Sequence, residues 1–134
     1  MQASHFDQLL QTAMAQPDPV RLLFVFAAAE LPDEATPDQR ARFEAGEGGA
    51  LSPLMCVDKA PDDLASFAAL EAESRRAGPP WQVVFAAALA GQDGKPPTQA
   101  QVEVALQSMV DAVHAGGIGR FAAFDVKGDP IQFA

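Results

Sequence analysis

The segment from Arg21 to Leu31, RLLFVFAAAEL, constrains the fold of this chain more than any other stretch. Successive side chains of a strand point to opposite faces. Leu22, Phe24 and Phe26 would share one face, and the alternate residues, which are also apolar, would share the other. A strand that is apolar on both faces is buried between two layers, usually of helices. Prolines at positions 19 and 32 bound the segment closely, which favours a strand over a buried helix.

A second run, Trp81 to Leu89, shows the same pattern. Shorter strands are expected over Ala50 to Val57 and in a closing hairpin formed by residues 121–124 and 131–133. Apolar residues at helical spacing occupy the intervals between these strands. We therefore expect a single α/β domain over residues 1–134, with a mixed sheet of four or five strands covered by helices. The two long apolar runs should lie at the centre of the sheet.

Four helices are expected, and three of them begin with a capping pattern. In a capping box, a Ser or Thr hydroxyl accepts a hydrogen bond from the amide three residues later, whose side chain reaches back. Ser4, Thr36 and Thr98 occupy the first position of such patterns. The fourth helix should run from Pro61 to about Ala77, with two aspartates in its first turn, where the helix dipole favours negative charge.

The two halves of the chain share an order of features. Residues 25–29 and 84–88 both read VFAAA, and a Thr-x-x-Gln helix start follows each copy. After each helix come a Gly-Gly pair and an apolar strand, which ends in Asp58 or Asp125. This order suggests duplication of a β-loop-α-β unit. The alternative is that alanine-rich sequence and common capping chemistry recur by chance.

Charge limits the classes of partner. The formal net charge is -9, with 9 Lys and Arg residues against 18 Asp and Glu residues. Nucleic-acid backbones and anionic membranes both bind basic surfaces, so neither is an expected partner. The apolar stretches are too short to span a bilayer, and no basic residue precedes Arg21 as a secretory signal requires. We therefore expect a cytoplasmic location.

Three segments resemble a known family: Phe24 to Ala29, Thr36 to Gly46, and Ser52 to Lys59, which reads SPLMCVDK. They resemble a family of small, uncharacterised proteobacterial proteins, and the likeness covers nearly the whole chain. Members are often labelled automatically as ribonucleotide reductase alpha subunits. That reaction needs a cysteine radical and a redox cysteine pair, which the single Cys56 cannot supply. The first half is also similar, in the order of its elements, to the SseB-type module, which implies a non-catalytic protein.

No motif in the sequence specifies catalysis, a metal or a cofactor. Cys56 lies within an apolar strand, and nothing places His5 or His114 near it, so we expect a buried structural cysteine. The acidic segment after Leu31 lacks the alternating Asp and Gly spacing of a calcium loop. The turn at residues 46–49 lacks the Lys-Ser/Thr of a phosphate-binding loop. We therefore expect no catalytic residue, no metal ligand and no cofactor.

Charged residues at strand ends form the candidate ligand site, namely Glu30, Asp58, Lys59, Asp125 and Lys127. In open α/β sheets, ligands bind beyond the carboxyl ends of the strands. A cleft is therefore expected where the strands finish at Glu30 and Asp58, and the positive end of the next helix would add to the charge of Lys59. The alternative is that Asp58 positions the helix after it, and that Asp125 and Lys127 lie in an exposed hairpin.

These features favour a non-catalytic interaction or regulatory module that binds a small ligand or a protein partner. The alternative is a small enzyme whose cleft uses Asp58 and Lys59, or Cys56, and it requires those side chains to lie together. Apolar residues make up 49% of a chain of only 134 residues, which also predicts a homodimer. The expected contact is the aromatic hairpin, which carries Phe121, Phe124 and Phe133.

Overall fold

The computed structural model describes residues 5–30, 36–44, 50–119 and 121–131. Its centre is one antiparallel sheet, in which the strands lie in the order β2-β1-β3-β4. The strands are β1 (Val20–Glu30), β2 (Ala50–Lys59), β3 (Val83–Ala90) and β4 (Ala122–Asp125). The helices are α1 (His5–Met14), α2 (Pro37–Glu44), α3 (Phe67–Ala77) and α4 (Gln99–Ala115), and Pro61–Asp63 forms one 3-10 turn, η1.

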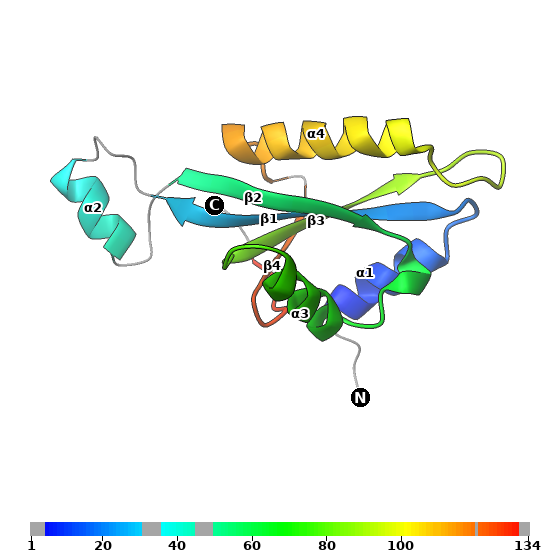
Figure 1. Ribbon diagram of the computed structural model, residues 1–134, viewed down its shortest axis with the longest axis horizontal. Helices are drawn as coiled ribbons and strands as arrows, with labels where there is room; N and C mark the ends of the chain where they lie inside the picture. Colours follow the sequence, from blue (N-terminus) through cyan, green and yellow to red (C-terminus); the bar gives the residue numbers. More distant parts are fainter. Residues whose placement is uncertain (1–4, 31–35, 45–49, 120, 132–134) are drawn as a thin grey trace.

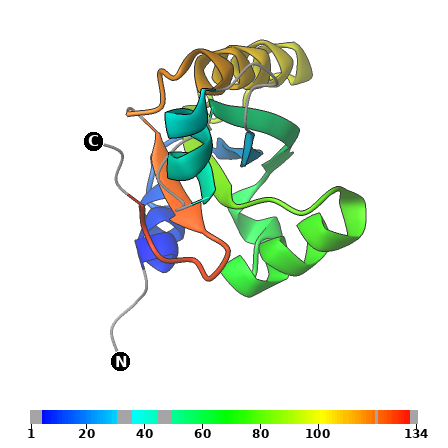
Figure 2. The ribbon, with the colours of Figure 1, turned by 90° about the vertical axis from the view of Figure 1, so that its left-hand side faces the viewer.

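Helices cover both faces of the sheet. Figure 1 and Figure 2 show α4 on one face and α1 and α3 on the other. α2 lies beyond the end of the sheet at which β1 finishes and β2 starts (Figure 1). The predicted α/β domain, with four strands and helical cover, is confirmed. None of the helices in the described part of the chain has both the length and the apolar content needed to cross a bilayer.

β1 lies at the centre of the sheet, as its sequence predicts. It pairs with β2 along one side and with β3 along the other. Leu22, Phe24 and Phe26 are buried in the layer that contains residues of α1 and α3. The alternate residues of the strand are buried in the layer that contains residues of α4. Both long apolar runs therefore form central strands, and both faces of β1 are covered.

An aromatic cluster connects α1 and α3 to the sheet. The ring centroid of Phe6 in α1 lies 5.1 Å from that of Phe67 and 5.5 Å from that of Phe124, with both pairs edge-on. Phe124 is only 3% exposed, so it is a core residue of β4. The predicted homodimer contact through the hairpin is wrong at this residue, because its ring packs inward. Phe121 is half-buried, and Phe133 lies outside the described residues.

The single tryptophan fastens α3 to the sheet. Nε1 of Trp81, just before β3, donates a 2.7 Å hydrogen bond to Oγ of the buried Ser74 in α3. Its ring lies 5.0 Å from that of Phe26, and the guanidinium carbon of Arg75 lies 5.3 Å from its centroid. Since a buried indole N–H without an acceptor is costly, Ser74 stabilises this packing.

β2 is an edge strand that contains a bulge. Its register against β1 shifts where Phe26 faces Met55 and Ala27 faces Pro53, so Leu54 is the extra residue of the strand. Proline has no N–H to donate to a ladder, and within sheets it is confined to edges, strand starts and bulges. Pro53 therefore fits β2 because the strand is at an edge and bulges at the next residue.

The sheet is antiparallel throughout, so the predicted mixed sheet is wrong in strand direction. All three neighbouring pairs run antiparallel. A parallel pair needs a connection that crosses back over a face of the sheet. The connection between β1 and β2 instead contains α2, which lies beyond the end of the sheet (Figure 1). β2 therefore returns beside β1 in the opposite direction.

The helix predicted from Pro61 to about Ala77 is two elements. η1 ends at Asp63, and α3 starts only after Ser66, whose Oγ accepts a hydrogen bond from the Ala69 amide. Leu64 and Leu70 are both buried in the same layer. In one continuous helix they would lie about 120° apart around the axis, on different faces. The break allows both side chains to reach the core.

The two halves share an order of elements but not an orientation. Each consists of a strand, a helix and an antiparallel strand, and Val25 and Phe26 of the first VFAAA segment pair with Phe85 and Val84 of the second. Phe26 and Phe85 occupy equivalent positions in those segments, yet they belong to the layers on opposite faces of the sheet. Superposing one repeat on the other would place the layer that buries Phe26 on the layer that buries Phe85, and different helices form these two layers. The duplication therefore stays a prediction.

Both capping boxes within the described residues form. The Thr36 amide donates to Oε1 of Gln39 at 2.8 Å, and the Gln39 amide donates back to Oγ1 of Thr36 at 3.2 Å. The Thr98 and Gln101 pair forms the same two bonds, at 2.9 and 3.1 Å. Ser4, the third predicted cap, lies outside the described residues.

Thr98→Ala is expected to lower the free energy of unfolding by about 1 kcal/mol, because the first turn of α4 loses a side-chain acceptor. Urea titration followed by circular dichroism measures this loss. Thr12→Ala is the control, because Thr12 is exposed on α1 and caps no helix. Equal losses in the two variants would show that the α4 capping box does not stabilise the fold.

Candidate functional site

Glu30 and Asp58 lie toward opposite ends of the sheet. In the register of β1 and β2, Asp58 faces Leu23, whereas Glu30 faces Ala50. Seven residues separate these positions along β1, which at about 3.4 Å per residue is roughly 24 Å. The prediction that both strands end at one cleft is therefore wrong, since antiparallel neighbours finish at opposite ends. Ligand binding at either end stays a prediction.

Asp58 and Lys59 point to opposite faces of β2, and each is held in an ion pair. Asp58 accepts hydrogen bonds from Nε and Nη2 of Arg21 at 2.9 and 2.6 Å. Lys59 donates to Oε1 of Glu73 in α3 at 2.7 Å. All of these side chains are partly exposed, so water screens both pairs. The two residues do not converge on one reacting group.

Asp125 and Lys127 belong to the turn after β4. One carboxylate oxygen of Asp125 accepts hydrogen bonds from the Lys127 amide at 2.9 Å and the Asp129 amide at 3.0 Å. Asp125 is half-buried and Lys127 is exposed. β4 and β2 are the two edges of the sheet, with two strands between them. The structure therefore does not bring the five predicted residues together, and Asp125 orders its own turn.

Cys56 is exposed, which contradicts the predicted buried cysteine. It pairs with Val25 on the face that α4 covers, but its position on the edge strand leaves its side chain open to solvent. His5 borders a hollow beside β4, at the opposite edge of the sheet. Within the described ranges, no three His, Cys, Asp or Glu side chains gather as metal ligands.

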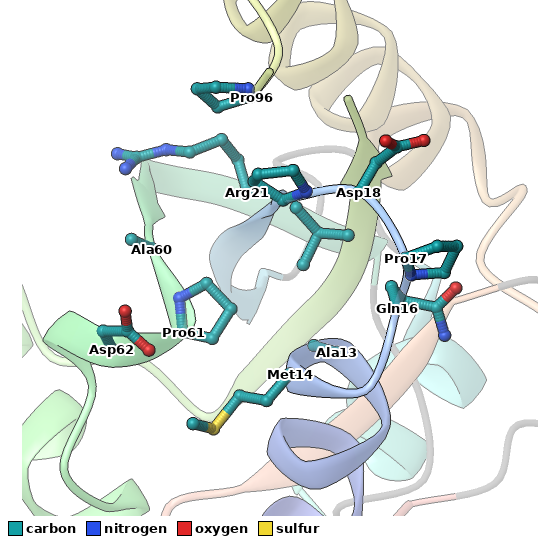
Figure 3. Close-up of a pocket in the computed structure, with 12 residues that line it drawn as sticks. Ala13, Met14, Gln16, Pro17, Asp18, Arg21, Ala60, Pro61, Asp62 and Pro96 are labelled. Carbon is teal, nitrogen blue, oxygen red and sulfur yellow. The ribbon is translucent and has the colours of Figure 1, made fainter. Parts of the chain in front are cut away.

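A cavity of about 540 Å³ lies where β1 starts and β2 ends (Figure 3). Its lining comes from the end of α1, the loop before β1, the segment after β2, and the loop before α4. In Figure 3, Arg21 and Pro96 lie on one side, Met14 and Ala13 on the opposite side, and Pro61 across from Pro17. Four prolines give this proline-lined cavity rigid walls, namely Pro17, Pro19, Pro61 and Pro96.

The proline-lined cavity is electronegative. Among the described residues that line it, Arg21 is the one cation, and Asp58 neutralises that charge in the ion pair. Asp18 and Asp62 also line the cavity, and the C-terminal end of α1 adds the partial negative charge of its carbonyls. The positive helix end predicted beside Lys59 is absent, because Pro61–Asp63 is only a single 3-10 turn. No helix dipole therefore adds positive charge beside Lys59 at this end of the sheet.

A second hollow, of about 310 Å³, lies between β2 and α3. Its lining is mostly apolar and combines buried, half-buried and exposed residues. We call it the β2–α3 groove, and its lining residues are Phe26, Met55, Cys56, Val57, Leu70, Glu73, Ser74 and Ala77. It runs beside the β2 edge of the sheet, whereas the proline-lined cavity lies at the end of the sheet.

The sequence analysis did not identify the prolines as parts of a site, and it did not predict that Arg21 would pair with Asp58. Arg21 is 37 positions from Asp58, so their pairing depends on the register of β1 and β2. The prolines at 17, 19, 61 and 96 were interpreted only as signals that a helix or strand begins or ends. In an antiparallel sheet, one strand begins beside the end of its neighbour, so such prolines can lie close together. Comparison with protein-family models, curated proteins and solved structures gave no match.

Proposed function

We propose that this protein is a non-catalytic module that binds a small ligand in the proline-lined cavity. The observation that carries the proposal is the cavity itself, which has rigid apolar walls and a few polar groups at its rim. Its position supports the expected site at the carboxyl end of β2, beside Asp58 and Lys59. Rigid walls favour binding, because little conformational entropy is lost when a ligand enters.

The charge of the cavity favours a ligand with a cationic group and an apolar body. Among the described lining residues no cation other than Arg21, which is already paired, faces the carboxylates of Asp18 and Asp62, and Asp18 also accepts a 2.8 Å hydrogen bond from the Gly94 amide. Coulomb attraction would draw an amine to this rim, and the proline and alanine walls would cover its apolar part. An anionic ligand would have to displace Asp58 from Arg21.

The dispersal of the reactive side chains supports binding rather than catalysis. The enzyme alternative requires Asp58 and Lys59, or Cys56, to share a cleft. Asp58 and Lys59 lie on opposite faces and in separate ion pairs. Paired acid–base catalysis by Asp58 and Lys59 would need both side chains within reach of one substrate, and this arrangement does not provide that.

The same proposal includes the cellular setting. An exposed thiol such as that of Cys56 persists in a reducing compartment, which supports the cytoplasm. A net charge of -9 argues against nucleic acid as a partner. The resemblance to uncharacterised proteobacterial proteins remains part of the proposal, and it suggests no reaction.

A thermal-shift screen tests the proposal, using alkyl and aryl amines, each matched with the corresponding carboxylic acid. Amines should raise the melting temperature, and the matched acids should not. Ala60→Trp, which places a large side chain in the cavity, should abolish the shift. Asp62→Lys should weaken amine binding by about fivefold, as expected for loss of an exposed charge contact.

Two variants on α4 are the controls. Ala115→Trp adds the same side chain at an exposed position away from the cavity, and Asp111→Lys makes the same charge change there. Both should bind amines like the wild type. Binding that survives Ala60→Trp unchanged would place the ligand elsewhere and exclude the proline-lined cavity as its site.

A further inference from the structure

The two edges of the sheet differ in how they are covered. At the β4 edge, the chain folds back on itself, because the Asp125 amide donates to the Asp129 carbonyl and the Ile131 amide donates to the Ala123 carbonyl, both at 2.9 Å. At the β2 edge, no other strand of the described residues pairs with the outer side. One edge is therefore closed by its own chain, and the other is open.

The register shows which backbone groups of β2 point outward. The Gln82 amide donates to the Ala27 carbonyl, so the backbone groups of Ala27 and of alternate β1 residues point toward β3. Those of Phe24 and Phe26 then point toward β2, where they face Val57 and Met55. The N–H and C=O groups of the intervening Cys56, and of Asp58, must point away from the sheet.

The open edge lacks the usual protection over part of its length. Natural edge strands carry charges, prolines or bulges that prevent pairing with another chain. Pro53 and the bulge at Leu54 protect the first half of β2. The stretch from Met55 to Val57 is regular and uncharged, and the half-buried Met55 and Val57 line the β2–α3 groove beside it.

We propose that a second copy of the chain binds this edge, with its β2 antiparallel to the first and the two-fold axis at Val57. Cys56 of each copy then faces Asp58 of the other, and their outward groups form four backbone hydrogen bonds. This register uses only the regular half of β2, where every residue has an N–H. The two sheets would join into one sheet of eight strands.

A second copy suits this edge better than a flexible peptide. Its β2 is already extended, so pairing orders little additional chain. No like charges lie directly opposite one another in this register, because Asp58 faces Cys56 and Lys59 faces Met55. Val57 of the second copy would lie against the groove lined by Val57 and Leu70, which covers apolar surface.

Association should strengthen with salt. Each copy carries a formal charge of -9, so two copies repel each other at long range, while the paired strands contribute little charge. Sedimentation velocity should show a mass that rises with concentration from 14.1 kDa toward twice that value, and does so at lower concentration in higher salt. This inference is independent of the proline-lined cavity.

Cys56→Pro and Cys56→Ser form the matched test. Proline removes the outward N–H of position 56 without removing a bond to β1, and Met55 before it is already in the extended region that proline requires. Cys56→Ser keeps the N–H and should dimerise like the wild type. Cys56→Pro should dimerise at least about tenfold more weakly, because two intermolecular hydrogen bonds and the close approach of the strands are lost.

Disulfide trapping tests the register without a proline. In the Cys56→Ser background, Val57→Cys places one thiol at the two-fold axis, where directly opposed Cα atoms lie about 4.5 Å apart, within disulfide range. Mild oxidation should give a covalent dimer. Leu51→Cys in the same background is the control, because its two copies would lie roughly 40 Å apart.

Several outcomes would overturn the proposal. They are equal dimerisation of Cys56→Pro and Cys56→Ser, equal crosslinking of the Val57→Cys and Leu51→Cys proteins, or ready oxidation of the wild type through Cys56. The proposal would also be overturned if the wild-type protein stayed monomeric up to about 500 μM. A dimer with a dissociation constant in the micromolar range would be almost fully formed at that concentration. In that case the open edge would be left for an extended segment of another protein.

Discussion

Phe24→Ala is expected to lower the free energy of unfolding by about 3–5 kcal/mol, the largest single loss that we predict. Phe24 is fully buried at the middle of the central strand, and its ring is stacked 6.2 Å from that of Phe6 in α1. Truncation removes the burial of the ring and leaves a cavity between the sheet and α1. Urea titration followed by circular dichroism measures the loss.

Val104→Ala is the control for this prediction. Val104 is 71% exposed on α4, so its truncation should change the unfolding free energy by less than about 0.5 kcal/mol. If Phe24→Ala cost no more than Val104→Ala, β1 would not be the buried centre of the fold.

Gly91→Ala is expected to cost about 3 kcal/mol, through a steric mechanism. A Cβ atom at this position would lie 1.8 Å from the Lys95 carbonyl oxygen and 2.8 Å from the Pro19 carbonyl oxygen. Both are backbone atoms, so the loop after β3 would have to move. The Gly91 amide also donates to the Pro19 carbonyl at 2.9 Å, and that movement would break the bond.

Gly119→Ala provides the comparison, because a Cβ atom at position 119 meets nothing within 4 Å. Its melting temperature should stay within a few degrees of the wild type, whereas that of Gly91→Ala should fall by about 10 °C or more for a domain of this size. Similar melting temperatures for the two variants would show that the loop after β3 yields without cost.

The elements that the sequence predicted correctly are those that local rules determine. Alternation of apolar residues placed both faces of β1 in the core, and the Thr36 and Thr98 boxes depend only on residues three positions apart. Strand direction depends on where a connection lies in space, and α2 lies beyond the sheet rather than across it (Figure 1). The break after η1 depends on a distant core that Leu64 must reach.

The candidate site was harder to predict, because it depends on pairing. Adjacent strand residues must point to opposite faces, so the separation of Asp58 from Lys59 was available from the sequence. The Arg21 and Asp58 ion pair was not, since 37 positions separate the two residues. The exposure of Cys56 likewise follows from the edge position of β2, which only the strand order gives.

The packing of Trp81 gives the protein a built-in spectroscopic reporter. The chain has one tryptophan and no tyrosine, so a single indole dominates its ultraviolet emission. That indole donates to Ser74 and packs against Phe26, with Arg75 above its ring. Undocking of α3 would transfer the indole from an apolar layer into water and shift its emission to longer wavelength. Intrinsic fluorescence therefore follows the attachment of α3 to the sheet, and with it the integrity of the β2–α3 groove, without any added label.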